Sequence, residues 1–438
     1  MSGSRNERLR IEGTVAPAFE SVRALYAYNM QTLEERNTQL CVYHKGEKVV
    51  DLWATAIGDE RFSPNSLVNV FSSGKSLEAI AMASLVSKGL LDYEAKVADY
   101  WPEFGANGKG DLTIADLMRH EAGLAVFNTP LEAEDLLVEN IKQNRVGRLI
   151  EGHPQKFPAN TDSRREYHAI TRGWIVNEVF RRVDPAGRTI GEFLREDISG
   201  PLEVDANIGV KEADLKRVSR VAPLGFLFQL LQSLKPKFLG RRIEFNIFQI
   251  LGRLFRILPL IRNSTTRGAP RPFKDMDRIG YFNEPAIAMG ETPSANANCS
   301  ARGLAKIAAM MSAGGRWKGT EYLSEAAWKA MHADSIHADM GFMRTAFTRG
   351  GVNEFVETDA ASPHLDRAFN AGREGFFGWM GLGGSIFQWH RRHEIGFGYV
   401  PTSLNVLDFL NERGKAYQAE VLRCVERLDS EPGLRPRD

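Results

Sequence analysis

The sequence predicts a mixed α/β protein in which a sheet domain, built from both ends of the chain, carries an inserted and mainly helical domain. Two observations predict this class: β-rich segments gather near the two ends of the 438-residue chain, and helical patterns fill the middle. The content of 43% hydrophobic and 25% charged residues is ordinary for a globular chain with a large core. We expect the sheet domain in residues 1–71 and 290–438 and the helical domain in residues 72–289.

The amino-terminal part of the sheet domain is expected to contain a helix and a hairpin. Apolar residues recur at helical spacing over residues 14–37. Two β-rich runs, 39–43 and 48–53, flank the polar sequence His44-Lys45-Gly46-Glu47. Such a pair of runs around a short polar turn is typical of a β-hairpin.

Helical patterns dominate from Ser72 onward. The first starts at Ser72 or Ser73, either of which could cap it, and ends at Gly89. Two later runs, 383–389 and 395–400, read as strands joined by a charged turn. The further helices are expected at 112–120, 132–150, 170–200, 301–313 and 405–428.

One segment of the helical domain, residues 221–268, is both strongly apolar and basic. It holds eight Lys and Arg residues against the single acid Glu244, a local charge of +7. A basic apolar helical pair suits peripheral contact with a membrane surface, or a lid over an apolar substrate site. The simpler alternative is an insertion that packs on the helical domain while its arginines stay solvated.

The charge and cysteine content exclude several classes of protein. With 56 Lys and Arg against 55 Asp and Glu, the net charge of +1 does not favour nucleic acid as a partner. The three cysteines, Cys41, Cys299 and Cys424, are far apart, which argues against a disulfide scaffold or a zinc site. The first 13 residues lack the apolar core of a signal peptide, so we expect a cytoplasmic protein.

The sequence Ser72-Ser73-Gly74-Lys75 is the sharpest short motif. Residues three apart on a helix share a face, so the Ser72 hydroxyl and the Lys75 amine can meet. A serine becomes a nucleophile when a neighbour takes its proton, and a lysine can do so when burial lowers its pKa. This spacing alone is common, and the alternative is a helix cap followed by a surface lysine.

Longer segments resemble the serine β-lactamase and penicillin-binding-protein superfamily, in the class C-like branch that includes family VIII carboxylesterases. The resemblance begins in residues 67–124, around LVNVFSSGKSLEAIAMASLVSKGLLDYEAKVADYWPEF. It covers most of the chain except 215–285 and implies an antiparallel sheet flanked by helices from both chain ends. The further matching segments are 167–174, 198–202, 301–305 and 378–385.

This resemblance implies roles for individual residues. Ser72 is the expected nucleophile, Lys75 its activating partner, and Tyr167, which matches the tyrosine of the family's Y-x-N motif, shares the acid–base work. The backbone N–H groups of Ser72 and Leu382 would form the oxyanion hole. The residues expected to bind substrate are Trp379, Met380, Gly381 and His168.

Two departures from the family pattern change the predicted substrate. The Asn of Y-x-N is Ala169 here, and the third motif, usually K-T-G or H-x-G, is Trp379-Met380-Gly381. The lysine of K-T-G supplies a cation for a substrate carboxylate, which a tryptophan cannot replace. Because a W-x-G motif resembles that of family VIII esterases, the sequence favours neutral esters.

We therefore predict a serine hydrolase that forms an acyl-enzyme, acts as a carboxylesterase on small-molecule esters and needs no metal or organic cofactor. One alternative is a catalytically weak member of the superfamily with an assembly or membrane-surface role through residues 221–268. A β-lactamase or peptidase is a further alternative. No G-x-S-x-G sequence occurs, which disfavours an α/β-hydrolase.

Overall fold

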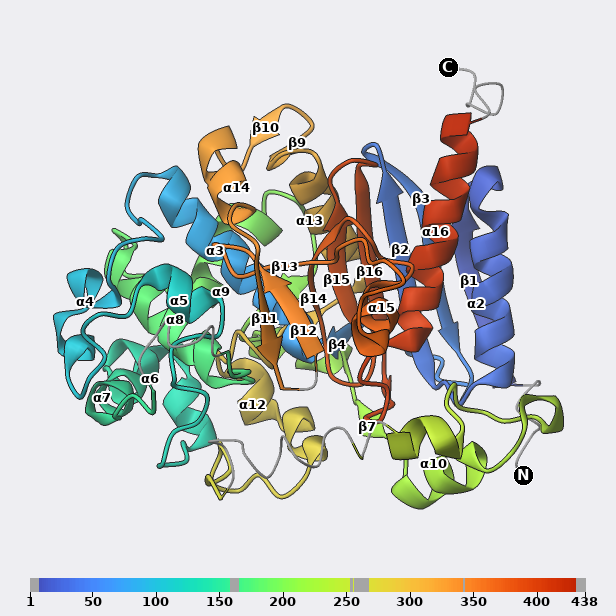
Figure 1. Ribbon diagram of the computed structural model, residues 1–438, viewed down its shortest axis with the longest axis horizontal. Helices are drawn as coiled ribbons and strands as arrows, with labels where there is room; N and C mark the ends of the chain where they lie inside the picture. The colour runs from blue at the N-terminus through green and yellow to red at the C-terminus, as the bar shows by residue number, and fades with distance from the viewer. Residues whose placement is uncertain (1–7, 158–164, 253–254, 256–267, 342, 431–438) are drawn as a thin grey trace.

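The computed structural model describes residues 8–157, 165–252, 255, 268–341 and 343–430, and within these residues the largest sheet is nine-stranded and antiparallel (Figure 1). Its strand order is β1-β3-β2-β16-β15-β14-β13-β12-β11. Strand β2 pairs with β16, so the two ends of the chain meet in one sheet, which confirms the predicted fold class. The strands are β1 (Arg10–Val15), β2 (Asn37–His44), β3 (Glu47–Thr55), β11 (Ile336–Met340), β12 (Met343–Phe347), β13 (Asn353–Glu354), β14 (Phe376–Met380), β15 (Ile386–His390) and β16 (Ile395–Pro401).

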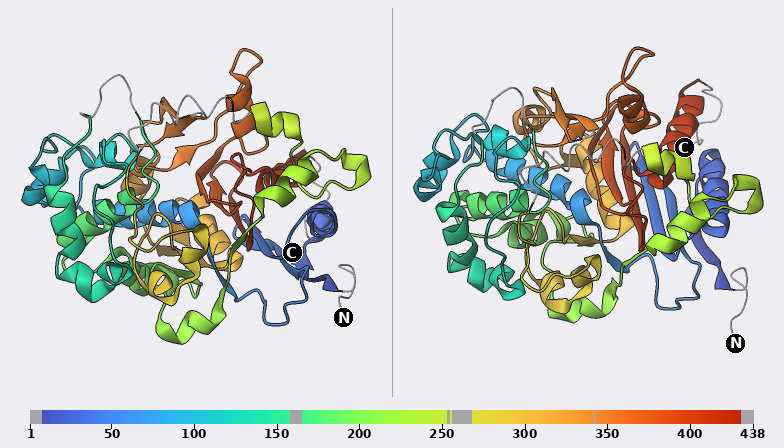
Figure 2. Two further views of the ribbon diagram at one scale, coloured as in Figure 1. Left: turned by 90° about the horizontal axis from the view of Figure 1, so that it is seen from below. Right: turned by 60° about the horizontal axis from the view of Figure 1, so that its bottom comes forward.

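Helices from both chain ends cover this sheet. Helices α2 (Glu20–Thr32) and α16 (Glu412–Ser430) pack together, and α13 (Ala301–Ser312) packs directly against β16, β2 and β15 (Figures 1 and 2). Neighbouring strand residues enter different hydrophobic clusters: Leu40 lies in the cluster with α2 and α16, and Cys41 lies in the cluster with α13. The central strands are therefore buried on both faces, which explains their nearly continuous apolar runs.

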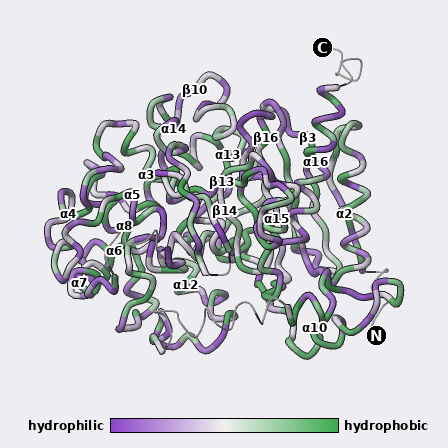
Figure 3. The backbone as a smooth tube through the Cα atoms, in the orientation of Figure 1, coloured by the Kyte–Doolittle hydropathy of each residue, from purple (hydrophilic) through white to green (hydrophobic). Residues whose placement is uncertain are grey.

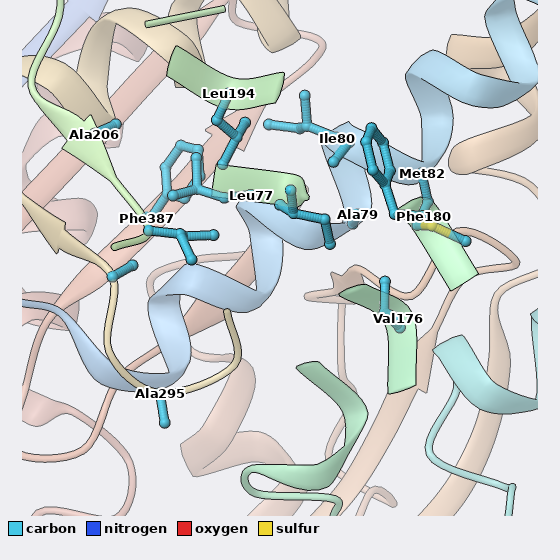
Figure 4. Close-up of a cluster of buried hydrophobic side chains, with 14 of the residues drawn as sticks. Leu77, Ala79, Ile80, Met82, Val176, Phe180, Leu194, Ala206, Ala295 and Phe387 are labelled. Carbon is cyan, nitrogen blue, oxygen red and sulfur yellow. The ribbon is translucent and has the colours of Figure 1, made fainter. Parts of the chain in front are cut away.

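The second region of the molecule is built around α3 (Lys75–Ser87), whose residues from Lys75 to Leu85 are all buried. Side chains from α8 (Thr171–Val183), from Leu194 and from Phe387 of β15 lie around its apolar residues (Figure 4). A helix enclosed on every side can bury a lysine at its first position. The other helices are α4 (Val97–Tyr100), α5 (Ile114–Met118), α6 (Val138–Lys142), α7 (Arg145–Gly152), α8 (Thr171–Val183), α9 (Ile190–Phe193), α10 (Phe226–Ser233), α12 (Pro285–Met289), α14 (Glu325–Met331) and α15 (His364–Asn370).

Short strands join this region to the sheet. Strand β4 (Leu67–Asn69), which leads into α3, pairs with β8 (Asn298–Cys299) and with β6 (Val218–Ser219), while β5 (Ala206–Asn207) extends the same small sheet. The start of α3 is thus held by chain that comes from far along the sequence. The limits of the helical domain, residues 72–289, stay a prediction.

The hairpin and most of the predicted helical regions are confirmed, but 132–150 and 170–200 are each divided into shorter helices. Further differences lie at element ends. Residues 14–37 are not all helical, because residues 10–15 pair with β3 as an edge strand before α2 begins at Glu20. Helix α16 begins at Glu412 rather than at 405, since the preceding residues turn against the loop at Gly383. Ser72 and Ser73 do not cap α3, because they lie in a 3₁₀ turn, Phe71–Gly74, and the Ser73 hydroxyl bonds Ser385 instead.

The basic segment 221–268 is described in part. It contains α10, a 3₁₀ turn at Lys237–Leu239 and helical residues 247–252, while residues 253–254 and 256–267 lie outside the described residues. Among the described residues, we find no helix with the length and apolar content needed to cross a bilayer.

Two glycines of β16 allow α13 to approach the sheet. A Cβ atom on Gly398 would lie 2.5 Å from the Ala301 carbonyl oxygen and 3.0 Å from the Ala305 nitrogen, and Gly396 is equally close to the backbone of the same helix. Both neighbours are backbone atoms of a packed helix, so they cannot rotate away. The glycines therefore determine how close helix and sheet lie.

We expect Gly398→Ala to lower the free energy of unfolding by about 1–3 kcal/mol, because the added methyl group must displace the backbone of α13. The urea midpoint measures the effect. Gly152→Ala is the matched control, since no atom lies within 4 Å of the position of its added Cβ. Equal midpoints for the two variants would contradict this account of the packing.

Candidate active site

Ser72 lies in the 3₁₀ turn between β4 and α3. The preceding residue, Phe71, has a φ of +47°, a conformation that bulky residues rarely adopt. Two contacts hold it there: the Asn69 side chain accepts the Phe71 N–H at 2.8 Å, and the Phe282 ring packs edge-on at 5.3 Å between centroids. The chain therefore turns sharply just before Ser72, whose side chain remains partly exposed.

The Lys75 amine lies beside this hydroxyl and is almost completely buried. Its nitrogen is 3.3 Å from Ser72 Oγ, and it donates to the backbone carbonyls of Ala169 at 2.7 Å and Ser294 at 3.0 Å. Burial lowers the pKa of Lys75 well below its ordinary value; the nearby Glu78 carboxylate opposes this shift and Arg172 adds to it. Burial therefore makes the neutral form of the amine easier to populate than it is in water.

A neutral lysine amine has two N–H donors and one lone pair. The two carbonyl oxygens can only accept hydrogen bonds, so they take both N–H groups. If the amine is neutral, its lone pair is left for the third neighbour, the Ser72 hydroxyl, whose oxygen lies 3.3 Å away. This arrangement suits transfer of the serine proton to lysine.

Tyr167 is the third member of the cluster. The Lys75 amine lies 4.9 Å from the centroid of its ring. The Trp379 indole N–H donates to the phenol oxygen at 3.0 Å, which uses the one polar group of that side chain. The buried surroundings raise the pKa of Tyr167, and hydrogen bonds with Ser72 and Trp379 partly offset this rise. The phenol is therefore protonated at neutral pH.

The turn that follows β14 is fastened to the chain just before Ser72. The Ser385 hydroxyl donates to the Val70 carbonyl at 2.7 Å and lies 3.1 Å from the Ser73 hydroxyl. Gly381 is required here, because a Cβ atom would overlap the Val70 carbonyl and the Ser385 hydroxyl. Leu382, at the tip of the turn, is therefore held close to the serine turn.

The backbone N–H groups of Ser72 and Leu382 form no hydrogen bond with any residue that the structure describes. Neighbouring amides in both turns are bonded: Ser73 N–H donates to the Val70 carbonyl and Gly381 N–H donates to the Ser385 carbonyl. Two free amides on facing turns are what an oxyanion hole requires.

The lysine depends on three groups that the sequence did not indicate. Two are the carbonyls of Ala169 and Ser294, which carry no side-chain signature. Small residues make room for the second: a Cβ atom on Gly173 would lie 2.5 Å from the Ser294 nitrogen, and one on Gly74 would lie 2.6 Å from the Pro293 carbonyl. These glycines were the only sequence signal for a close approach of backbone.

The third group is Arg172, which is fully buried beneath the lysine. It forms an ion pair with the buried Glu78 at 3.0 Å and donates to the backbone carbonyl of Lys75 at 3.1 Å. It also bonds the carbonyls of Met118 and Gly351, so one guanidinium joins four segments of the chain. Its sequence signal was its place in residues 167–174, one of the segments that carry the family resemblance.

The expectation that His168 binds substrate is not met. Its ring is completely buried; Nε2 accepts the Leu124 N–H at 3.0 Å, and Nδ1 bonds the Glu166 carbonyl at 2.6 Å. Both ring nitrogens are thus used to hold loops. His120 is also buried and packs 5.0 Å from the Tyr167 ring.

The third motif is also more buried than expected. Only 4% of Trp379 is exposed, and its N–H is used by Tyr167, so this side chain can offer a substrate no more than a narrow apolar edge. Met380 is buried with its sulfur 3.2 Å from Arg373. Of the four residues expected to bind substrate, Trp379 and Gly381 are the two that line the turn near Ser72.

Comparison with known proteins identifies the family of this chain. Residues 22–420 match the beta-lactamase family. The esterase/beta-lactamase LipL of Mycobacterium tuberculosis is 29% identical over 327 residues, which cover 72% of this chain and 67% of LipL.

Solved structures share the fold. A family VIII carboxylesterase has a TM-score of 0.73 at 24% identity, over 95% of this chain and 100% of that chain. A penicillin-binding protein homologue from Caulobacter crescentus has a TM-score of 0.72 at 24% identity, over the same shares. EstA from Arthrobacter nitroguajacolicus also has a TM-score of 0.72 at 24% identity, over 95% of this chain and 98% of EstA.

The buried histidines predict an acid-labile fold. Burial lowers the pKa of His168 from 6.5 to about 3, so between these values the unfolded chain binds a proton that the folded protein does not. The free energy of unfolding should therefore fall as the pH drops below 6.5, by up to about 1.4 kcal/mol per pH unit for this residue.

His168→Asn should reduce this slope by about that amount, as measured by urea unfolding at several pH values below 6.5. His364→Asn is the control, because it makes the same substitution at a histidine that is exposed in the folded protein. If both variants kept the slope of the unmodified protein, His168 would not be the group that titrates.

Proposed function

This chain belongs to the beta-lactamase family and is a serine hydrolase, and we propose that it cleaves neutral carboxylic esters through an acyl-enzyme on Ser72. One observation carries the proposal: a buried lysine amine has both of its N–H groups bonded to carbonyls and its remaining side toward the Ser72 hydroxyl. Such an amine is a base that is already desolvated and oriented before substrate arrives.

The proposed reaction begins when Ser72 Oγ attacks the ester carbonyl carbon and its proton passes to Lys75 Nζ. The carbonyl oxygen becomes an oxyanion that accepts from the N–H groups of Ser72 and Leu382, and removing one such donor typically costs about 2.7–4 kcal/mol of catalysis. When the C–O bond breaks, the alkoxide takes a proton from the Tyr167 phenol. Lys75 returns its proton to Tyr167, which restores the phenol and the neutral amine.

Water completes the cycle. The water oxygen attacks the acyl carbon and the water gives a proton to Lys75. Lys75 then passes that proton to Ser72 Oγ, and Ser72 leaves as the free alcohol. Lys75 and Tyr167 therefore have distinct roles in the proposed reaction. The lowered pKa of Lys75 suits a proton acceptor, and the raised pKa of Tyr167 suits a proton donor.

The third motif supports neutral substrates. The family's lysine at this position would offer a cation to a carboxylate, and here Trp379 directs its single donor at Tyr167 instead. The nearby cations, Arg172 and Arg373, are completely buried and bond backbone carbonyls. A substrate carboxylate would gain no charge-assisted hydrogen bond from these groups.

We expect Ser72→Ala to reduce hydrolysis of short p-nitrophenyl esters by at least about a thousandfold and to abolish labelling by a fluorophosphonate probe, because the nucleophile is lost. Ser84→Ala is the matched control: Ser84 lies on the same helix and is buried, and its hydroxyl donates to the Ala81 carbonyl. Ester hydrolysis that survives Ser72→Ala would end the proposal. Faster turnover of nitrocefin than of esters would favour the β-lactamase alternative.

Trp379→Phe tests whether Tyr167 acts as the proton donor. The change keeps an aromatic plane and removes the donor that lowers the pKa of Tyr167, so that pKa should rise further. The alkaline limb of kcat/KM should therefore move to higher pH while the acid limb, governed by Lys75, stays in place. We expect kcat to fall about tenfold with the loss of one hydrogen bond.

The control for this variant is Trp328→Phe, which removes a buried indole donor to the Met311 carbonyl outside the site. It should leave both limbs of the pH profile unchanged. An alkaline limb that does not move in Trp379→Phe would show that Tyr167 does not set it.

A further inference from the structure

In helix α10 polar side chains are buried and apolar side chains are exposed, which is the reverse of an ordinary surface helix. Its buried residues are Gln229, Gln232 and Ser233, whereas Phe226 and Leu227 are 71% and 66% exposed. These side chains bond within the segment: the Gln229 amide donates to the Leu224 carbonyl and Gln232 accepts the Arg242 N–H, while Gln229 Oε1 has no partner among the described residues. A surface helix normally turns its apolar stripe toward the protein. This helix turns it outward.

The exposure continues beyond the helix. Phe238 in the following turn is 85% exposed, and Phe248 in the next helical stretch is 80% exposed. Of the thirteen large apolar residues exposed in the described chain, nine lie between residues 226 and 255. Figure 3 shows this apolar colouring around α10, and Figures 1 and 2 place α10 at the edge of the molecule. We define the apolar platform as Phe226, Leu227, Leu231, Leu234, Phe238, Leu239, Phe248 and Leu251.

The platform is held firmly on the protein. The Leu224 N–H donates to the Leu404 carbonyl at 2.9 Å where β7 (Ala222–Pro223) pairs with β17 (Ser403–Leu404). At its other side, Arg242 forms an ion pair with Glu34 at 2.5 Å, and the Glu34 N–H donates to the Arg242 carbonyl. The apolar side chains are therefore presented outward by a fixed backbone.

The charge around the platform has one sign. Lys235 and Lys237 lie between α10 and Phe238, and both side chains are exposed. From residue 215 to residue 274 the sequence holds one acidic residue, Glu244, which faces the body of the protein near Arg413. Lysines next to exposed Phe and Leu side chains match the interface of a bilayer with anionic headgroups.

We propose that the apolar platform docks peripherally on a lipid bilayer that contains anionic lipids. The Phe and Leu side chains enter the boundary between headgroups and acyl chains, and Lys235 and Lys237 bind the lipid phosphates. Contact between two copies of this chain explains the platform less well. Two such surfaces would bring four lysines together without an acidic side chain of the platform to offset them.

Flotation with vesicles tests the proposal. The full chain is mixed with vesicles of phosphatidylcholine alone, or of phosphatidylcholine with a minor share of phosphatidylglycerol, at low and at high salt. Phe226→Ser with Phe238→Ser removes apolar contacts, and Lys235→Gln with Lys237→Gln removes charge. Ile336→Ser with Lys318→Gln is the matched control, because both residues are exposed at distant sites. Thermal melting verifies that every variant is folded, and no readout depends on hydrolysis.

The unmodified protein and the control should float with the anionic vesicles, and less so at high salt. The lysine variant should bind roughly 30-fold more weakly, at about 1 kcal/mol for each lysine, and the apolar variant should bind neither kind of vesicle. An unmodified protein that stays at the bottom of the gradient, or variants that float equally well, would overturn the proposal. So would a dimer in sedimentation that the apolar variant converts to a monomer without any vesicle binding.

Discussion

The desolvation of the Lys75 amine is the constraint on which the rest of the site depends. A charged ammonium is costly to bury, and among the described residues no carboxylate forms an ion pair with the amine; the carboxylate of Glu78, one turn along α3, is engaged by Arg172. The protein meets the hydrogen-bonding needs of a neutral amine with two carbonyls and leaves its lone pair for Ser72. The enclosed helix α3, the close-packed loop at Ser294 and the Ala169 carbonyl are all needed to maintain this state.

The antiparallel sheet provides the opposite wall of the site. Strand β14 ends in the turn that holds Leu382, and Ser385 fastens this turn to Val70 and Ser73. The turn that carries Leu382 is therefore held near Ser72 by contacts between residues more than 300 positions apart in sequence. The fold makes these contacts possible, because β16, which follows β15, pairs with β2 and brings the two ends of the chain together.

Trp379 stands where the family pattern usually has lysine or histidine, and this difference has two consequences. The position carries no cation that could bind a substrate carboxylate, and the indole N–H donates to Tyr167, which we assign as the acid. The basic segment 221–268 follows the same principle: its polar side chains bond to the protein, and its apolar side chains are exposed. In both places a polar group forms hydrogen bonds inside the protein, and the groups that stay exposed determine which molecules the protein can contact.

The sequence by itself determined the local features of this protein. The Ser72 and Lys75 side chains meet because the turn of a helix brings residues three apart together, and the hairpin and central strands follow from β-rich runs. The basic apolar character of residues 221–268 was also evident in the sequence, but its outward orientation was not.

Only the tertiary structure decided which groups complete the site. Carbonyls such as those of Ala169 and Ser294 exist at every residue, so no sequence pattern distinguishes the two that bind the lysine. The burial of His168 and the bond from Trp379 to Tyr167 likewise arise from packing between distant segments, which residue type and spacing do not encode.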